Sequence, residues 1–200
     1  MSQWSVDQAN EWYKQYNWLV GCNFLPSTSV NQLEMFQSET FDRSIIIKEL
    51  SLARGIGFNS LRVYLHDLLW NKKDTFCKNF NEFLSITDEL DLKPIIVLFD
   101  DCHRSNPVAG KQMLPVLGVH NSRWAQSPGY KIVKEIHDNN LTEVVRLKNF
   151  VQEVLDKYSK DERILMWDIY NEPGQFGNND NSYKLLNMTW EWAHEVRPQQ

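Results

Sequence analysis

The residues best suited to chemistry are Asn171 and Glu172, which follow the apolar segment 164–170 and precede Pro173 and Gly174. A glutamate at the end of a parallel strand lies where a barrel opens to its substrate. A carboxyl group that is partly removed from water there can serve as a general acid, and the neighbouring amide offers both a donor and an acceptor to a hydroxyl-rich ligand. All four residue types also tolerate a solvated turn, so a purely structural role remains an alternative.

Apolar patterns predict four strands and four helices that alternate along the chain. The strands are expected at 18–24, 60–66, 94–99 and 164–170, and the helices at 44–54, 79–92, 141–160 and 182–196. The first and third strands are short apolar runs and are predicted to be buried. The segment 100–140 contains several proline and glycine residues, and we expect a long folded loop with a function. Strict alternation predicts a parallel sheet with right-handed crossovers.

Two architectures fit this alternation, an open doubly wound sheet and a (β/α)8 barrel. The sequence contains neither a GxGxxG nor a GxxxxGK[ST] motif, which removes the usual marker of a nucleotide-binding open sheet. Polar residues instead follow each expected strand, as they do at a barrel mouth: Asn23, His66-Asp67, Asp100-Asp101 and Asn171-Glu172. We therefore predict an α/β fold, an incomplete (β/α)8 barrel of four βα units with a long loop after the third strand.

Four landmarks in the correct order carry a resemblance to a known family. They are Gly-Cys-Asn at 21–23, Gly-Phe-Asn-Ser-Leu-Arg-Val at 57–63, Lys-Pro-Ile-Ile-Val-Leu-Phe-Asp at 93–100 and Asn-Glu-Pro at 171–173. Together they resemble the strand endings of the clan A glycoside hydrolases, in particular the cellulase-like family 5 enzymes. The resemblance extends over residues 18–198. It implies a retaining O-glycosyl hydrolase that cleaves β-glycosidic bonds of oligo- or polysaccharides.

The resemblance also implies roles for three residues. Glu172 matches the general acid/base, Asn171 matches the partner of the sugar 2-hydroxyl, and Arg62 matches the arginine beneath the catalytic carboxylates. Arg62 alternates in phase with Tyr64 and His66, so all three side chains are expected to point the same way. A buried ion pair between Arg62 and Asp168 is the structural alternative.

Further substrate contacts are proposed for His66, Asp101, His120 and Trp124, with Trp124 as a possible stacking platform for a sugar ring. The strand-three histidine of the family has no clear counterpart, because Asp100, Asp101 and His103 all lie in that region. These three residues could equally fix the loop by hydrogen bonds.

A retaining glycosidase needs a second carboxyl group about 5–5.5 Å from the first. In the family it is a glutamate at the end of strand seven, whereas four strands form half a barrel. We therefore expect residues 1–200 to form one domain, the N-terminal half of a catalytic barrel, with its nucleophile beyond Gln200 and no activity alone. The alternatives are a non-catalytic carbohydrate-binding protein and an unrelated open α/β enzyme that uses Asp100, Asp101 and His103.

Composition limits the partners. A net charge of −5 argues against a nucleic-acid-binding protein, and no stretch approaches 18 uncharged apolar residues, so no membrane partner is predicted. The first residues contain no cationic segment followed by an apolar one, so a cytoplasmic location is the default prediction. Five scattered histidines and three cysteines without a CxxC pair predict neither a metal nor a cofactor. The expected partner is a carbohydrate, and the oligomeric state stays open.

Overall fold

The computed structural model describes residues 4–198 and contains one four-stranded parallel sheet. Its strands are β1 (Gly21–Asn23), β2 (Ser60–Tyr64), β3 (Lys93–Asp100) and β4 (Met166–Asn171), and they lie in the order β1-β2-β3-β4. Because the order never reverses, the sheet has no switch point of the doubly wound kind. This arrangement confirms the predicted incomplete barrel, although the expected domain limits, residues 1 and 200, lie outside the described residues.

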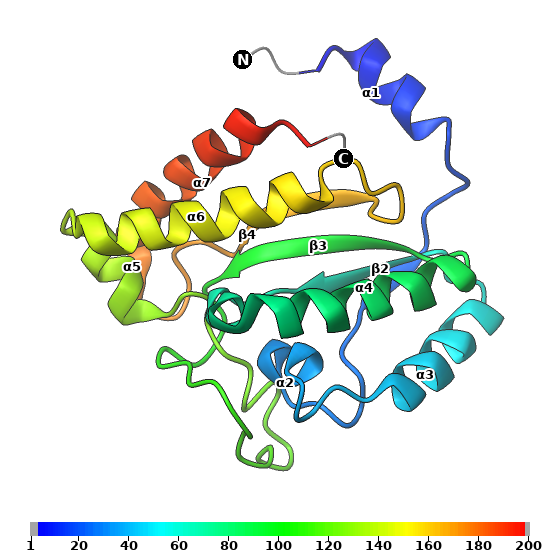
Figure 1. The fold of residues 1–200 in the computed structure, drawn as a ribbon, viewed down its shortest axis with the longest axis horizontal. Coiled ribbons are helices and arrows are strands. Elements are labelled where there is room, and N and C mark those ends of the chain that lie inside the picture. The colour runs from blue at the N-terminus through cyan, green and yellow to red at the C-terminus, as the bar shows by residue number, and fades with distance from the viewer. Residues whose placement is uncertain (1–3, 199–200) are drawn as a thin grey trace.

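Helices connect the strands and cover one side of the sheet (Figure 1). They are α2 (Gln32–Phe36), α3 (Arg43–Gly55), α4 (Lys73–Glu89), α5 (Tyr130–His137), α6 (Leu141–Tyr158) and α7 (Ser182–Val196), with the short 3-10 helices η1 (Asp67–Lys72) and η2 (Asn179–Asn181). The helix α1 (Val6–Tyr13) precedes β1, lies apart from the sheet and buries none of its residues. Figure 1 shows α3, α4, α6 and α7 following one another around the sheet. The rings of Phe80 and Tyr158, 5.0 Å apart, join α4 to α6.

Aromatic side chains dominate the core between the sheet and these helices. The ring of Phe36 packs edge-on against Phe76, Phe80 and Phe83 at centroid distances of 5.6–5.8 Å. All four rings are almost completely buried. Edge-to-face pairs of this kind stabilise the packing beyond the area that they bury. The short helix α2 is therefore fixed onto α4, and this position becomes important for the loop after β3.

The structure differs from the sequence-based predictions in strand β1 and in the helices before and after it. The first strand is shorter than 18–24, and the three residues Gly21–Asn23 are exposed rather than buried. They form an edge of the sheet, and the chain enters the core only at Phe24. The helices α1 and α2 were not predicted, because eight and five residues are too few for a clear helical period.

The segment expected to be a loop also contains helix α5, so the irregular part ends at Gly129. α4 begins at Lys73 rather than 79. α6 begins where predicted, because the Asn140 side chain accepts hydrogen bonds from the backbone N–H groups of Thr142 and Glu143. Among residues 4–198, no helix combines the length and the apolar character needed to cross a bilayer.

Candidate active site

Strands β2 and β4 bring an arginine, an aspartate and an asparagine together on one face of the sheet. Arg62 lies on β2, and its guanidinium group pairs with the carboxylate of Asp168 on β4. The Nη2 atom of Arg62 also donates a hydrogen bond to Oδ1 of Asn171 at 2.9 Å. The side chains of Arg62 and Asp168 remain 25% and 29% exposed. The alternative of an Arg62–Asp168 ion pair is therefore present, and the same guanidinium group also fixes Asn171.

The amide of Asn171 is held at both ends. Its Oδ1 atom accepts from Arg62, and its Nδ2 atom donates to Oδ1 of Asp100 at 2.9 Å. These two partners fix which end of the amide is oxygen and which is nitrogen. The second N–H of Asn171 faces the sulfur of Cys102 at 3.7 Å, a weak acceptor that a ligand oxygen can displace.

Asp100 links this face of the sheet to the long loop. Its Oδ2 atom accepts from the indole N–H of Trp124 at 2.5 Å, and its Oδ1 atom also accepts from the backbone N–H of Cys102 at 2.9 Å. Burial raises the pKa of Asp100, although these hydrogen bonds oppose the shift. The Trp124 ring meets Tyr64 edge-on at 4.9 Å, and burial raises the pKa of Tyr64 to about 12. The predicted site residue Trp124 therefore does lie beside Arg62 and Asn171.

Glu172 projects from the end of β4 in an unusual backbone conformation. Its φ angle is +47°, in the left-handed region that residues other than glycine seldom adopt. Its side chain is exposed on the same face, and its Oε2 atom lies 3.4 Å from the thiol of Cys102. Backbone conformations of this kind are frequent at functional sites.

Asp101 points to the opposite side of the sheet from Asp100. Its carboxylate accepts hydrogen bonds from the Tyr170 hydroxyl at 2.8 Å, the Gly174 backbone N–H at 2.6 Å and the Ser182 hydroxyl at 2.5 Å. It is fully buried, and burial raises its pKa. Asp101 was predicted to contact substrate, but these partners occupy it, and it ties the turn after Glu172 to helix α7. Ser182 is the first residue of that helix.

His66 is also placed differently from the prediction. Strand β2 ends at Tyr64 and η1 begins at Asp67, so the alternation that was expected to align His66 with Arg62 is broken. His66 is completely buried, and its Nδ1 atom lies 2.9 Å from the carboxylate of Asp67 and 3.2 Å from the backbone nitrogen of Leu68. In this position His66 caps η1 and has no surface toward the face that carries Arg62.

His120 lies at the exposed part of the loop rather than in the Arg62 cluster. Its ring meets that of His103 at 5.9 Å, and His103 in turn meets Phe176 at 4.4 Å. Phe176 belongs to the turn that follows Glu172. The loop and the turn therefore touch through the rings of His103 and Phe176. His120 contacts His103 and not the Arg62 cluster itself.

Sequence reasoning missed Cys102 and Tyr64 as members of the site. Cys102 follows Asp100 by two residues, so alternation alone would place both side chains on one face. Burial, together with the negative charges of Asp100 and Glu172, raises the pKa of the Cys102 thiol. The thiol therefore remains protonated and can donate to Glu172. Among residues 4–198, no group of three or more His, Cys, Asp or Glu side chains is arranged to hold a metal ion.

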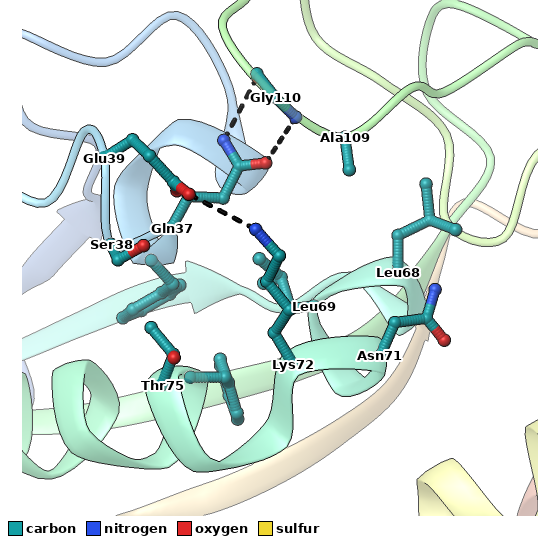
Figure 2. Close-up of a pocket in the computed structure, with 12 residues that line it drawn as sticks. Gln37, Ser38, Glu39, Leu68, Leu69, Asn71, Lys72, Thr75, Ala109 and Gly110 are labelled. Atoms are coloured by element: carbon teal, nitrogen blue, oxygen red, sulfur yellow. Dashed lines mark hydrogen bonds and ion pairs between the residues drawn. The ribbon is translucent and has the colours of Figure 1, made fainter.

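A largely apolar cavity lies elsewhere in the structure (Figure 2). It has a volume of about 230 Å³ and lies between α2, η1, α4 and the loop after β3. Figure 2 shows two polar contacts across it, between Gln37 and Gly110 and between Glu39 and Lys72. None of its lining residues belongs to the Arg62–Asn171–Glu172 cluster.

Comparisons with known proteins support the fold. No protein-family model matches the sequence, and no curated protein matches it. Solved structures do match. An exo-β-1,4-mannosidase, Op5Man5, from Opitutaceae bacterium strain TAV5 is 16% identical with a TM-score of 0.62, over 90% of this chain and 30% of that one. An endo-1,4-β-mannanase from Rhizomucor miehei is 16% identical with a TM-score of 0.55, over 83% of this chain and 52% of that one.

A third similar structure is a GH5_18 protein from Streptomyces cattleya in complex with Manβ1-4GlcNAc. It is 10% identical with a TM-score of 0.54, over 85% of this chain and 42% of that one. At these identities the likeness establishes the fold, and it confirms at that level the resemblance to clan A glycoside hydrolases. The chain spans between 30% and 52% of the length of these three proteins.

Proposed function

We propose that this chain carries the acid/base half of a retaining β-glycosidase active site, with Glu172 as the general acid/base. The observation that carries the proposal is the pairing of Asn171 and Glu172 at the end of β4. The amide of Asn171 is fixed by Arg62 and Asp100, and the carboxyl group of Glu172 is exposed on the same face.

The reaction needs two carboxyl groups with different tasks. Glu172 would give a proton to the leaving oxygen while a carboxylate nucleophile attacks the anomeric carbon and forms a glycosyl ester. Glu172 would then take a proton from water, whose oxygen displaces the ester and regenerates the nucleophile. We propose that this second carboxylate comes from the part of a barrel that faces β1–β4, since Asp168 is paired with Arg62.

Asn171 and Trp124 would bind the sugar. The N–H of Asn171 that Asp100 leaves unused can donate to the 2-hydroxyl of the sugar next to the scissile bond. The ring of Trp124 is half-buried and is held by Asp100 and Tyr64, so it could present an ordered apolar surface to a pyranose. Arg62 would supply charge and hydrogen bonds only, because a guanidinium group keeps its proton at working pH.

We further propose β-1,4-linked mannosides as the substrate class. Two of the three similar structures carry names that denote action on such bonds, and the third binds Manβ1-4GlcNAc. Their sequences are too different to transfer a substrate, so the names serve here as support for a choice of assay.

The test uses a protein in which the four strands are completed to a closed barrel by fusion to the second half of a related barrel. It is incubated with β-1,4-mannooligosaccharides, and the anomeric form of the first product is followed by proton NMR. We expect the β anomer first, as retention requires. Binding of the oligosaccharide without turnover would support the non-catalytic alternative, and an α product would exclude a retaining mechanism.

A further inference from the structure

The loop after β3 exposes an apolar tip. Leu114 is 82% exposed and Leu117 is 95% exposed, and the neighbouring Met113, Val116 and Val119 are also exposed. Figure 1 shows this loop in green, projecting away from the helices that cover the sheet. Contiguous apolar surface of this kind usually marks a contact with a protein or with a membrane.

The same loop is cationic in a chain that is otherwise acidic. No Asp or Glu occurs between Asp101 and Glu135, although the whole chain has a net charge of −5. Arg104, Lys111 and Arg123 all line one cavity of about 200 Å³ at the base of the tip, whose wall also contains Met113. Among the residues that the structure describes, no carboxylate lies in the wall of this cavity.

Polar side chains on and before α2 hold the base of the loop. Asn31 donates to the carbonyl of Arg123 at 3.0 Å, and Glu34 accepts from the backbone N–H of Gln112 at 2.9 Å. The Gln37 amide exchanges two hydrogen bonds with the backbone of Gly110, as Figure 2 shows. The exposed tip is therefore presented by a fixed base.

Several backbone groups of the tip form hydrogen bonds with other groups of the same loop. The Val116 N–H donates to the Ser122 hydroxyl at 2.8 Å, and Nε of Arg123 donates to the carbonyl of Leu114 at 2.6 Å. The Val119 N–H donates to the carbonyl of Val116. Internal partners lower the cost of moving a backbone out of water into an apolar medium.

We propose that the tip, residues 113–119, inserts into the surface of an anionic phospholipid bilayer, and that the cavity below it receives a lipid phosphate group. The charge of the loop complements such a surface, and aliphatic side chains above a ring of cations are the pattern of an interfacial anchor. A protein interface would be richer in aromatic residues, and the tip contains none.

This binding mode differs from a membrane span. The run of residues 113–119 is too short to cross a bilayer, so the absence of spanning segments does not bear on it. Nor does the inference depend on the proposed glycosidase function. Because Trp124 of the loop bonds to Asp100 and His103 touches the turn after Glu172, the loop would hold the Asn171–Glu172 face near the lipid surface.

The experiment is co-sedimentation of the chain with lipid vesicles. One set contains phosphatidylcholine with about one third phosphatidylglycerol, and the other contains phosphatidylcholine alone. We expect binding to the anionic vesicles that weakens in high salt, and at least about tenfold weaker binding to the neutral ones. Equal binding to both sets, or no binding to either, would overturn the proposal.

Variants separate the tip from the cavity. Leu114→Ser with Leu117→Ser should weaken binding to anionic vesicles by about tenfold or more, because two inserted side chains are lost. Its matched control is Leu52→Ser with Ile56→Ser, which removes two other exposed apolar side chains on and beside α3 and should leave binding unchanged. Circular dichroism establishes that both variants are folded.

The cation arm uses Arg104→Gln with Lys111→Gln, which should remove the preference for anionic lipid. Its control, Lys48→Gln with Lys78→Gln, neutralises two exposed lysines on α3 and α4 and should keep that preference. If the tip variant binds vesicles like the parent chain and instead changes its elution from a sizing column, the tip is a protein contact and the proposal is wrong. If a low concentration of inorganic phosphate releases the parent chain from anionic vesicles, and the tip variant still binds those vesicles, the cavity is a site for a free anion. The proposal is then wrong as well.

Discussion

The thiol of Cys102 lies 3.4 Å from Oε2 of Glu172 and is oriented to donate a hydrogen bond to it. The same sulfur lies 3.7 Å from Nδ2 of Asn171, so it touches both members of the proposed catalytic pair. Burial and the negative charges of Asp100 and Glu172 raise the pKa of the thiol, which keeps its proton in place. Cys102 therefore acts as a positioning residue for the Glu172 carboxyl group.

The raised pKa of Cys102 predicts slow alkylation. At about pH 8 the thiolate, which is the reactive form, is scarce, so iodoacetamide should modify Cys102 far more slowly than the exposed Cys22. Peptide mass spectrometry at timed intervals measures both rates in one sample. The control is the chain in urea, where the two cysteines should react alike. Fast modification of Cys102 in the folded chain would show that its thiol is not held as described.

The ion pair of Arg62 with Asp168 should contribute modestly to stability. Both side chains are about a quarter exposed, so water screens the pair. We expect Arg62→Met to cost about 1 kcal/mol and to lower Tm by about 2–4 °C. The matched control is Arg43→Met, whose partner Glu82 is more exposed, and it should change stability by less than about 0.5 kcal/mol. A larger loss for Arg43→Met than for Arg62→Met in thermal melts would contradict this ranking.

Asp101 should be more important for the Glu172 turn than for the sheet as a whole. Asp101→Asn replaces a carboxylate oxygen that accepts from Gly174 and Ser182 by an amide, and losing these buried bonds should cost about 1–3 kcal/mol. Hydrogen exchange of the Gly174 amide should accelerate more than that of the amides in β3. Asp138→Asn, on the surface beside Lys134, serves as the control and should leave both rates unchanged.

The ion pairs of Asp67 predict a loss of stability in acid. Burial acts to raise the pKa of Asp67, but His66 and Arg146 outweigh it and hold the pKa at about 2, below its ordinary value of 3.8. The pairs therefore contribute stability that is present above about pH 4 and is lost as the pH falls through about 2. Over this window urea unfolding should show a decline of about 2 kcal/mol that Asp67→Asn lacks. Parallel declines in both proteins would mean that other carboxyl groups are responsible.

Much of the fold could be predicted because its signals are periodic. The buried run of β3 and the long apolar stripe of α6 each follow one repeat for many residues, and both lie where expected. The exposure of β1 could not be predicted, since the segment 18–24 is mostly apolar, whereas Gly21–Asn23 lies at an edge of the sheet. α5 was hidden by its eight-residue length and by the Pro128-Gly129 pair directly before it.

The candidate site was predictable where alternation continues and not where it breaks. Asn171 ends strand β4, and Glu172 follows it directly, as the apolar run before them predicted. His66 and Asp101 follow points at which the chain leaves the strand geometry, so counting residues assigned them to the wrong surroundings. The pairing of Asn171 with Asp100 depends on strand register, which a single sequence does not specify.

The role proposed for Glu172, acid/base of a retaining glycosidase, can be tested by one comparison in the completed barrel. Glu172→Gln should lower kcat for a natural β-glycan by about 10²–10⁴-fold, because the leaving oxygen then receives no proton. For an aryl glycoside with a good leaving group, the rate of the first step, formation of the glycosyl ester, should change little. Added azide should then restore turnover and yield a β-glycosyl azide. Undiminished hydrolysis of the natural glycan by Glu172→Gln would contradict the assignment.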